Sequence, residues 1–226
     1  IVQLPESGET YVPHMEEKTV HFHYVRHGET VFNQTDRFQG WSDSPLTQKG
    51  IEQAKEVREY VKDVPYAFAC CSTALRTRDT AEMILQGRDM IPLPLKALKE
   101  IHIGRYEAWN YTENIDILKP RSRSVHWKDV GGEDREDLAS RIKDAFALMT
   151  SRAKDGDTVL VVSHGGYYLN MLEVLFGIDR LAYRDSCEAK GKSCMPNCGL
   201  MKFDVVNGSY VFLDYMKSIS EWKESL

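Results

Sequence analysis

The sequence predicts an α/β fold, a three-layer α/β/α sandwich around a mostly parallel central sheet. Strand-like and helix-like segments alternate along the chain, which is the pattern of helices packed on a parallel sheet. The segment Thr158–Ser163 is a continuous apolar run, typical of a strand that is buried on both faces of such a sheet. A second segment, Thr19–Val25, is rich in β-branched and aromatic residues and runs directly into Arg26-His27-Gly28.

The first half of the chain contains two predicted strand–helix units. Thr47 has the side chain and position of an N-cap for the first helix. The expected bounds are Thr19–Val25 and Gln48–Lys62 for the first unit, and Tyr66–Cys71 and Ala74–Leu85 for the second. The following region, from Ile91 to Gly132, has no clear apolar period, and we expect loop and short helix there.

The second half of the chain continues the alternation. Apolar residues at helical spacing predict a helix from Glu133 to Ala153, and another helix is expected from the end of the buried strand to about Phe176. Asn207-Gly208 is a strong hairpin signal. It separates two predicted strands, Leu200–Val206 and Tyr210–Met216. The charged, glycine-containing stretch Tyr183–Pro196 is expected to be a mobile loop.

Composition and charge exclude several classes of protein. The net charge is −5, so a general affinity for nucleic acid or for an anionic membrane surface is not expected. No apolar run approaches the roughly 18–20 residues that a membrane span requires, and no signal-peptide pattern opens the chain. Five cysteines, an odd number, favour a reducing cytoplasm. We expect one domain over residues 1–226, with residues 1–18 as an N-terminal extension.

Two histidines follow the two strands that are predicted with most support. His27 comes after the strand 19–25 and His164 after the strand 158–163, and each is followed by glycine. In open α/β sheets, ligands bind at the carboxyl ends of the strands, so neighbouring strands would bring both imidazoles over one crevice. Arg26 and Arg76 also lie close to the ends of predicted strands, 19–25 and 66–71. Guanidinium groups suit the equatorial oxygens of a phosphoryl group in transfer. The pattern predicts an anion pocket built without a metal.

The ordered motifs resemble the histidine phosphatase superfamily, in its phosphoglycerate mutase-like branch. The resemblance covers nearly the whole chain from about residue 20 to residue 216. The residues that carry it are Arg26-His27-Gly28-Glu29-Thr30, Asn33, Arg37-Phe38-Gln39-Gly40-Trp41-Ser42-Asp43-Ser44-Pro45-Leu46-Thr47, Ser72 with Arg76 and Thr80-Ala81, Leu98-Lys99-Glu100-Ile101, Gly131-Gly132-Glu133 and Ser163-His164-Gly165-Gly166.

The resemblance implies a role for each residue of the pocket. His27 would attack phosphorus to form a phosphohistidine, and Glu100 would protonate the leaving group. The other implied residues hold phosphoryl oxygens (Arg26, Arg76, His164) or bind substrate (Asn33, Gln39, Gly40, Gly165). The implied partner is a small phosphorylated metabolite, without metal or cofactor. A homodimer is compatible with these features.

Three functions remain open: a phosphatase, a phosphoglycerate mutase, and a catalytically silent module that binds phospho-ligands. Ile101 stands where the mutases have an arginine, and Gln39 stands where they usually have threonine. The segment between Glu100 and Gly131 is also shorter than in the mutases. These features favour the phosphatase. The same segment, about residues 104–130, would form a specificity cap, lined by some of Arg105, Tyr106, Trp109, Tyr111, Arg121, Arg123 and His126.

Overall fold

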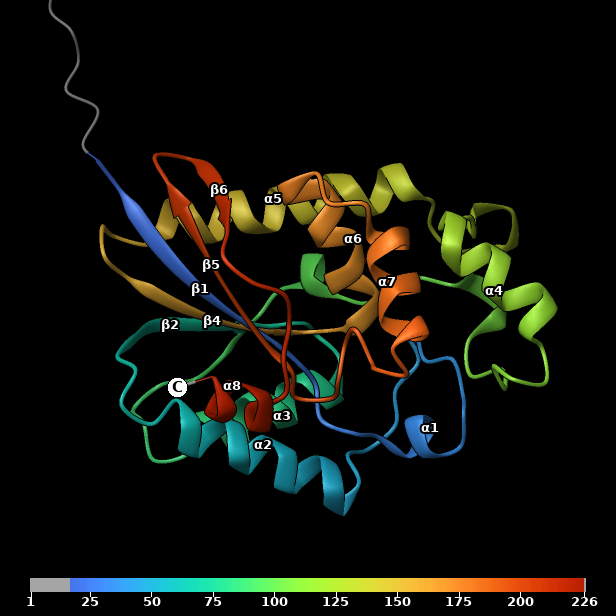
Figure 1. The fold of residues 1–226 in the computed structure, drawn as a ribbon, viewed down its shortest axis with the longest axis horizontal. Coiled ribbons are helices and arrows are strands. Elements are labelled where there is room, and N and C mark those ends of the chain that lie inside the picture. Colours follow the sequence, from blue (N-terminus) through green and yellow to red (C-terminus); the bar gives the residue numbers. More distant parts are fainter. Residues whose placement is uncertain (1–16, 226) are drawn as a thin grey trace, which may run out of the picture.

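The structure is a computed structural model that describes residues 17–225. Its strands form one mixed sheet in the order β3-β2-β4-β1-β5-β6 (Figure 1). The first four strands are parallel, β5 runs antiparallel to β1, and β6 forms a hairpin with β5. The bounds are β1 Thr19–Arg26, β2 Tyr66–Cys71, β3 Leu93–Pro94, β4 Thr158–Ser163, β5 Leu200–Val206 and β6 Ser209–Phe212. The predicted α/β sandwich with a mostly parallel sheet is confirmed. Most of the expected N-terminal extension, residues 1–16, lies outside the described residues.

Helices cover both faces of the sheet (Figure 1). α5 and α6 pack on one face, where Phe22 and Tyr24 of β1 join Phe146 in one hydrophobic cluster. α2, α3 and α8 pack on the other, around Val25 and Val162. The helices are α1 Val31–Gln34, α2 Gln48–Tyr60, α3 Leu75–Leu85, α4 Ile115–Ser124, α5 Arg135–Arg152, α6 Gly165–Phe176, α7 Arg180–Ala189 and α8 Ile219–Glu224. Within residues 17–225, no helix is both long and apolar enough to cross a membrane.

The prediction of a mobile loop over Tyr183–Pro196 is wrong for its first half, which belongs to α7. The Asp179 side chain caps this helix by accepting hydrogen bonds from the backbone N–H groups of Leu181 and Ala182. An Arg184–Glu188 pair one turn apart also supports this helix. The cap at Asp179 is a signal that the sequence contains before the predicted loop begins.

The last predicted strand, Tyr210–Met216, is too long. β6 ends at Phe212, which is paired with Phe203 of β5. Tyr215 leaves the sheet and stacks on Tyr183 of α7, with ring centroids 3.9 Å apart. This aromatic contact accounts for the early end of the strand.

The segment 104–130 contains α4 and two short 3-10 helices, Gly104–Tyr106 and Lys128–Val130. This agrees with the prediction of loop and short helix. α4 lies next to α7 at the end of the sheet to which the parallel strands point (Figure 1). Two hydrogen bonds from the Arg123 guanidinium to the Asp185 carboxylate join the two helices.

Candidate active site

The carboxyl ends of β1, β2 and β4 meet at one edge of the sheet. Arg26 at the end of β1 pairs with Ser163 at the end of β4, and Cys71 at the end of β2 pairs with Val162. The residues that follow these strands, His27, His164 and Ser72, therefore lie close together. The rings of His27 and His164 lie 5.5 Å apart between centroids.

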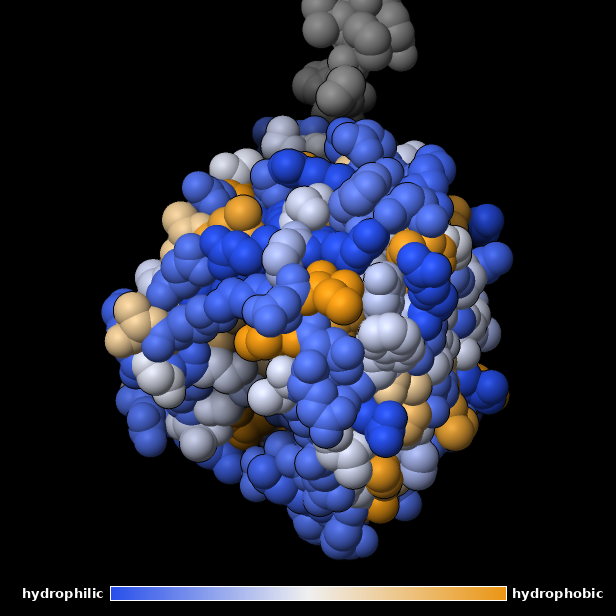
Figure 2. Space-filling view, turned by 90° about the vertical axis from the view of Figure 1, so that its right-hand side faces the viewer, coloured by the Kyte–Doolittle hydropathy of each residue, from blue (hydrophilic) through white to orange (hydrophobic). Residues whose placement is uncertain are grey.

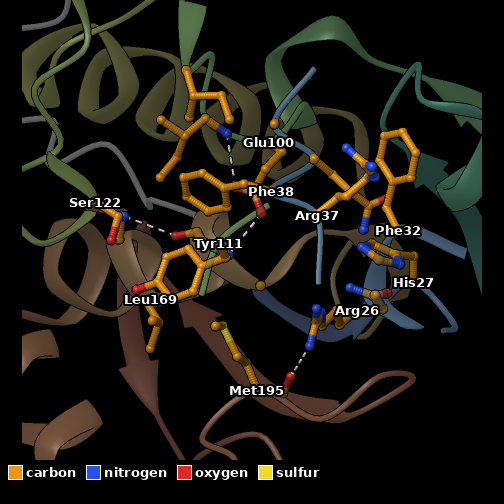
Figure 3. A pocket seen from close by; sticks show the side chains of 18 of the residues that line it. Arg26, His27, Phe32, Arg37, Phe38, Glu100, Tyr111, Ser122, Leu169 and Met195 are labelled. Carbon is orange, nitrogen blue, oxygen red and sulfur yellow. Dashed lines mark hydrogen bonds between the residues drawn. The ribbon is translucent and has the colours of Figure 1, made fainter. Parts of the chain in front are cut away.

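A cavity of about 310 Å³ opens at this edge (Figure 3). Figure 2 faces this end of the molecule and shows hydrophobic residues near the centre of a largely hydrophilic surface. His164 is fully buried beside His27 and does not line the cavity itself. The other residues that the sequence assigned to the site all line it: Arg26, His27, Asn33, Gln39, Gly40, Arg76, Glu100 and Gly165.

His27 is held with one ring nitrogen toward the backbone. Its Nδ1 atom lies 2.7 Å from the backbone oxygen of Gly28. Because a carbonyl oxygen only accepts, Nδ1 carries the proton of the neutral ring and Nε2 keeps the lone pair. Burial lowers the pKa of His27 well below its usual value, and the charges of Arg76 and Arg26 lower it further. The ring is therefore neutral at physiological pH, and its Nε2 atom is unprotonated.

The Arg76 guanidinium is held by carbonyl and carboxylate oxygens. It is 1% exposed and donates to the backbone oxygens of Ser42 and Gly40, both at 2.8 Å, and to Asp43 Oδ1 at 2.9 Å. Its Nη atoms are thus used within the protein, whereas its Nε is buried without a partner among residues 17–225. The guanidinium group is therefore held at the wall of the cavity in one fixed orientation.

Three buried nitrogen atoms of the site have no hydrogen-bond partner in the described part of the chain: Nε of Arg26, Nε of Arg76 and Nδ1 of His164. Arg26 is fixed by a hydrogen bond from Nη1 to the backbone oxygen of Met195 (Figure 3). Buried polar atoms are normally paired, and the two arginine donors among these atoms favour an anionic ligand with several oxygens.

His164 is positioned by a hydroxyl group. Its Nε2 atom lies 2.7 Å from Ser72 Oγ, the first residue after β2. Burial lowers the pKa of His164 well below its usual value, and the charge of Arg76 adds to this effect. The ring is therefore neutral, and the Ser72 contact determines which of its nitrogens carries the proton.

Glu100 is bound to the amino end of α6. Its Oε1 accepts hydrogen bonds from the backbone N–H groups of Tyr167 at 2.8 Å and Ile101 at 2.9 Å, and its Oε2 accepts from Gly166 at 2.9 Å. The free N–H groups at the start of a helix can bind an anion, and at the start of α6 a carboxylate of the protein takes two of them. A Cβ at Gly166 would lie 2.8 Å from Glu100 Oε1, so this contact requires glycine.

Two side chains hold the backbone carbonyl group of Glu100. Its carbonyl oxygen accepts from Trp41 Nε1 at 2.7 Å and from Arg141 Nη2 at 2.9 Å. Arg141 also pairs with the carboxylate of Glu133. The carboxylate of Glu100 is thus held against the cavity wall from two sides.

Asn33 and Gln39 belong to one network of hydrogen bonds around Thr30. Asn33 Oδ1 accepts from the Thr30 backbone N–H at 3.0 Å and from Asn197 Nδ2 at 3.3 Å. Because the oxygen of this amide is used, its NH₂ group is left to donate to a ligand. Gln39 Oε1 accepts from Thr30 Oγ1 at 3.0 Å, and the side chain is 8% exposed.

The predicted cap residues contribute less than the sequence suggested. Of the seven candidates, Tyr111 lines the cavity. Arg121 and Arg123 make bidentate ion pairs with Asp129 and Asp185 instead. The other four candidates, Arg105, Tyr106, Trp109 and His126, also lie away from the lining.

Several lining residues were missed at the sequence level: Ser122 of α4, Leu169 and Asn170 of α6, and Arg180 and Arg184 of α7. The capping signal at Asp179 predicts a helix over the two arginines. The direction in which that helix faces depends on packing between segments far apart in the sequence.

The chain resembles known proteins of one family. A family model described as histidine phosphatase superfamily (branch 1) matches residues 22–214. A 2,3-bisphosphoglycerate-dependent phosphoglycerate mutase 2 of Gloeobacter violaceus is 30% identical over 181 residues, which cover 76% of this chain and 81% of that protein. The adenosylcobalamin/alpha-ribazole phosphatase of Salmonella typhimurium is 31% identical over 147 residues, covering 63% and 72%. The structure of YhfR from Bacillus stearothermophilus has a TM-score of 0.72 at 26% identity, covering 88% of this chain and 99% of that one.

Proposed function

Because the chain belongs to the histidine phosphatase superfamily (branch 1), we propose that it is a metal-independent phosphatase of small phosphomonoesters whose nucleophile is His27. One observation carries the proposal. The Nδ1 atom of His27 donates to the backbone oxygen of Gly28 at 2.7 Å, so the lone pair is on Nε2 of a neutral ring that lines the cavity. A neutral imidazole nitrogen in that position is a competent nucleophile toward phosphorus.

The proposed reaction has two displacements. In the first, the Nε2–P bond of a phosphohistidine forms while the ester P–O bond breaks, and Glu100 gives a proton to the leaving oxygen. In the second, water attacks phosphorus, Glu100 takes a proton from it, and the Nε2–P bond breaks to release inorganic phosphate. The first displacement leaves Glu100 deprotonated, and the second displacement returns its proton.

The charge on the transferred phosphoryl group is balanced by donors of the protein. Arg26 and Arg76 are the proposed charged donors, His164 is proposed to contact the group through its buried Nδ1, and the NH₂ group of Asn33 is a neutral donor. Positively charged and preorganised donors of this kind stabilise the oxygens of phosphoryl transfer states. The scheme does not require a metal ion.

Hydrolysis is favoured over a mutase reaction by the side chains at two places. Ile101, next to Glu100, and Gln39, beside Gly40, both line the cavity. An apolar side chain at 101 cannot form the ion pair that an arginine would offer to the acid group of a phosphoglycerate. The mutase is the second candidate, because the Gloeobacter relative is a phosphoglycerate mutase.

The test is release of phosphate from an aryl phosphate in the presence of EDTA. We expect wild-type turnover with chelator, and loss of at least about 10³-fold in His27→Ala. The exposed His126 supplies the control variant, His126→Ala, which should keep the wild-type rate. A ³²P label that is stable to base and labile to acid should appear on wild-type protein in a rapid quench.

Three outcomes would contradict the proposal. Activity that disappears with EDTA and survives in His27→Ala would exclude the mechanism. Conversion of 3- to 2-phosphoglycerate, stimulated by bisphosphoglycerate and faster than phosphate release, would identify a mutase. Tight binding of phosphate without turnover of any ester would identify a silent binding module.

A further inference from the structure

The cavity extends well beyond the phosphoryl site and has a second group of arginines. We propose that its far end, formed around Arg180 and Arg184, binds a second anionic group of the substrate. The substrate is then a phosphomonoester whose other end carries a carboxylate or a second phosphate. This inference rests on the proposed function, because it treats the cavity as the place where a phosphomonoester binds.

Hydrogen bonds place Arg180 at the end of the cavity opposite His27. Arg180 Nη2 donates to the backbone oxygen of Arg123, the residue after Ser122. Ser122 lies across the cavity from His27, with Tyr111 and Phe38 between them (Figure 3). Arg184 is one turn further along α7 and lines the same cavity. A ligand that reaches from His27 to these arginines must extend through the cavity.

Both arginines have donors that the described protein does not use. Arg180 is 5% exposed; its Nε bonds to Glu173 Oε2 at 2.9 Å, and its Nη1 has no partner within residues 17–225. The side chain of Arg184 is 19% exposed and bonds through Nε to Glu188, which leaves both of its terminal nitrogens without a partner in the same range. Two partly dehydrated guanidinium groups with free N–H groups form a natural site for carboxylate or phosphate oxygens.

Arginines outnumber carboxylates in the lining of the cavity. Five arginines line it against two carboxylates, Asp36 and Glu100, and three of these arginines have an ion-pair partner outside the lining: Asp43 for Arg76, Glu173 for Arg180 and Glu188 for Arg184. The whole chain has a net charge of −5. A phosphoryl group alone needs the arginines next to His27, and those at the far end lie beyond its reach.

The wall between the two ends is largely apolar. Phe38, Ile103 and Leu169 line this middle part together with the ring of Tyr111. Phe38 and Tyr111 are near each other, with ring centroids 5.5 Å apart. A compact carbon skeleton or a ring fits this wall better than a strongly hydrated chain. The three parts of the cavity therefore match an ester with anions at both ends and carbon between them.

The experiment compares esters that differ in the second anion. Wild-type kcat/KM is measured for phenyl phosphate, 4-carboxyphenyl phosphate and hydroquinone bisphosphate, and for glycerol 3-phosphate against 3-phosphoglycerate as a shorter pair. We expect at least one anionic ester to exceed its neutral partner roughly tenfold or more. The carboxylated and the bisphosphorylated compounds distinguish which anion the site takes.

Variants then locate the preference. Arg184→Gln and Arg180→Gln should each reduce the ratio of kcat/KM between the anionic and the neutral ester by roughly tenfold. Lys190→Gln removes the same charge at the end of α7, away from the cavity, and should keep the wild-type ratio. Equal rates for every pair in the wild type, or a ratio unchanged in both arginine variants, would overturn the inference.

Binding to His27→Ala separates this inference from the proposed function. Calorimetry on that variant should show tighter binding of the anionic ester than of its neutral partner, and Arg184→Gln should remove the difference. Tighter binding without turnover in the wild type would retain the subsite and refute the phosphatase. Turnover of phenyl phosphate without any preference would retain the phosphatase and refute the subsite.

Discussion

Ser72 Oγ lies 2.7 Å from Nε2 of His164 and 2.6 Å from the hydroxyl of Thr77. The Thr77 hydroxyl donates to the backbone oxygen of Ala74 at 2.8 Å, so Ser72 donates to Thr77 and the Ser72 oxygen accepts from the Nε2–H group of His164. Nδ1 is the ring nitrogen that is buried without a partner among residues 17–225. We infer that Ser72 and Thr77 hold the tautomer of His164 that has its proton on Nε2 and its lone pair on the buried Nδ1.

Ser72→Ala should therefore lower the turnover of an aryl phosphate. Without the serine hydroxyl, the Nε2–H group of His164 loses its acceptor, and neither the tautomer nor the orientation of the ring is held. Loss of one preorganised group of such a site reduces kcat by roughly 100-fold. Steady-state kinetics give the loss, and ¹⁵N NMR of the imidazole reports the tautomer. An unchanged tautomer together with wild-type kcat would show that Ser72 is a packing residue.

Gly166→Ala should separate activity from stability. The added Cβ would lie 2.8 Å from Glu100 Oε1, so the carboxylate must move away from the amino end of α6. Alanine in place of glycine favours a helix by up to about 1 kcal/mol. We expect kcat to fall roughly tenfold or more while the melting temperature stays the same or rises. A variant that keeps the wild-type kcat would show that the position of Glu100 against α6 does not matter for turnover.

The stability of the fold should fall as the pH drops from about 6.5 toward 4. Burial lowers the pKa of His23 to about 4, with the charge of Lys202 as a smaller cause, and the pKa values of His27 and His164 are lowered as well. The unfolded chain binds protons at these histidines near pH 6.5, whereas the folded chain binds them only at lower pH. Each histidine then costs up to about 1.4 kcal/mol of unfolding free energy per pH unit in that window.

His23→Gln tests this pH dependence, because glutamine can keep the hydrogen bond to Tyr66 and cannot titrate. Urea unfolding between pH 4.5 and pH 8 should show a shallower loss of stability on acidification than in the wild type. Identical slopes in the two proteins would mean that His23 does not contribute.

Asp43→Asn should destabilise the fold. Asp43 Oδ1 lies 2.9 Å from Nη1 of Arg76, and the asparagine leaves that buried guanidinium without its charge partner. We expect a loss of roughly 1–3 kcal/mol in the free energy of unfolding, less than for a fully buried pair because Asp43 is partly exposed. Glu82→Gln removes an exposed partner of Arg78 on the same helix, and the change there should stay below about 0.5 kcal/mol. Equal effects of the two substitutions on chemical unfolding would contradict this reading of Asp43.

The sequence was sufficient for the sheet and for the residues at its edge. β2 and β4 have their predicted bounds because short β-branched and apolar runs leave few alternatives to a buried strand. Because β1 and β4 are neighbours in the sheet, the residues that follow them, His27 and His164, lie next to each other. This contact follows from the order of the strands, which the alternation of strands and helices in the sequence suggests.

The far wall of the cavity was not predictable in the same way. Arg180 faces the cavity because of contacts with Glu173 and with the backbone of Arg123, which is 57 residues away. Glu100 meets the amino end of α6 across 66 residues. Such contacts depend on how whole helices pack, and a single sequence contains no periodic signal for them.

The hydrogen bond from Arg26 to the Met195 carbonyl oxygen affects which sequences the segment 180–195 can have. Residues 180–195 supply Arg180, Arg184 and Met195 to the cavity, and Met195 meets Arg26 through its backbone oxygen. A backbone contact is indifferent to the side chain at that position. This stretch can therefore be replaced by sequences of similar backbone path while the guanidinium of Arg26 keeps its partner. It is a natural segment to exchange between homologues when a new substrate range is sought with the same chemistry.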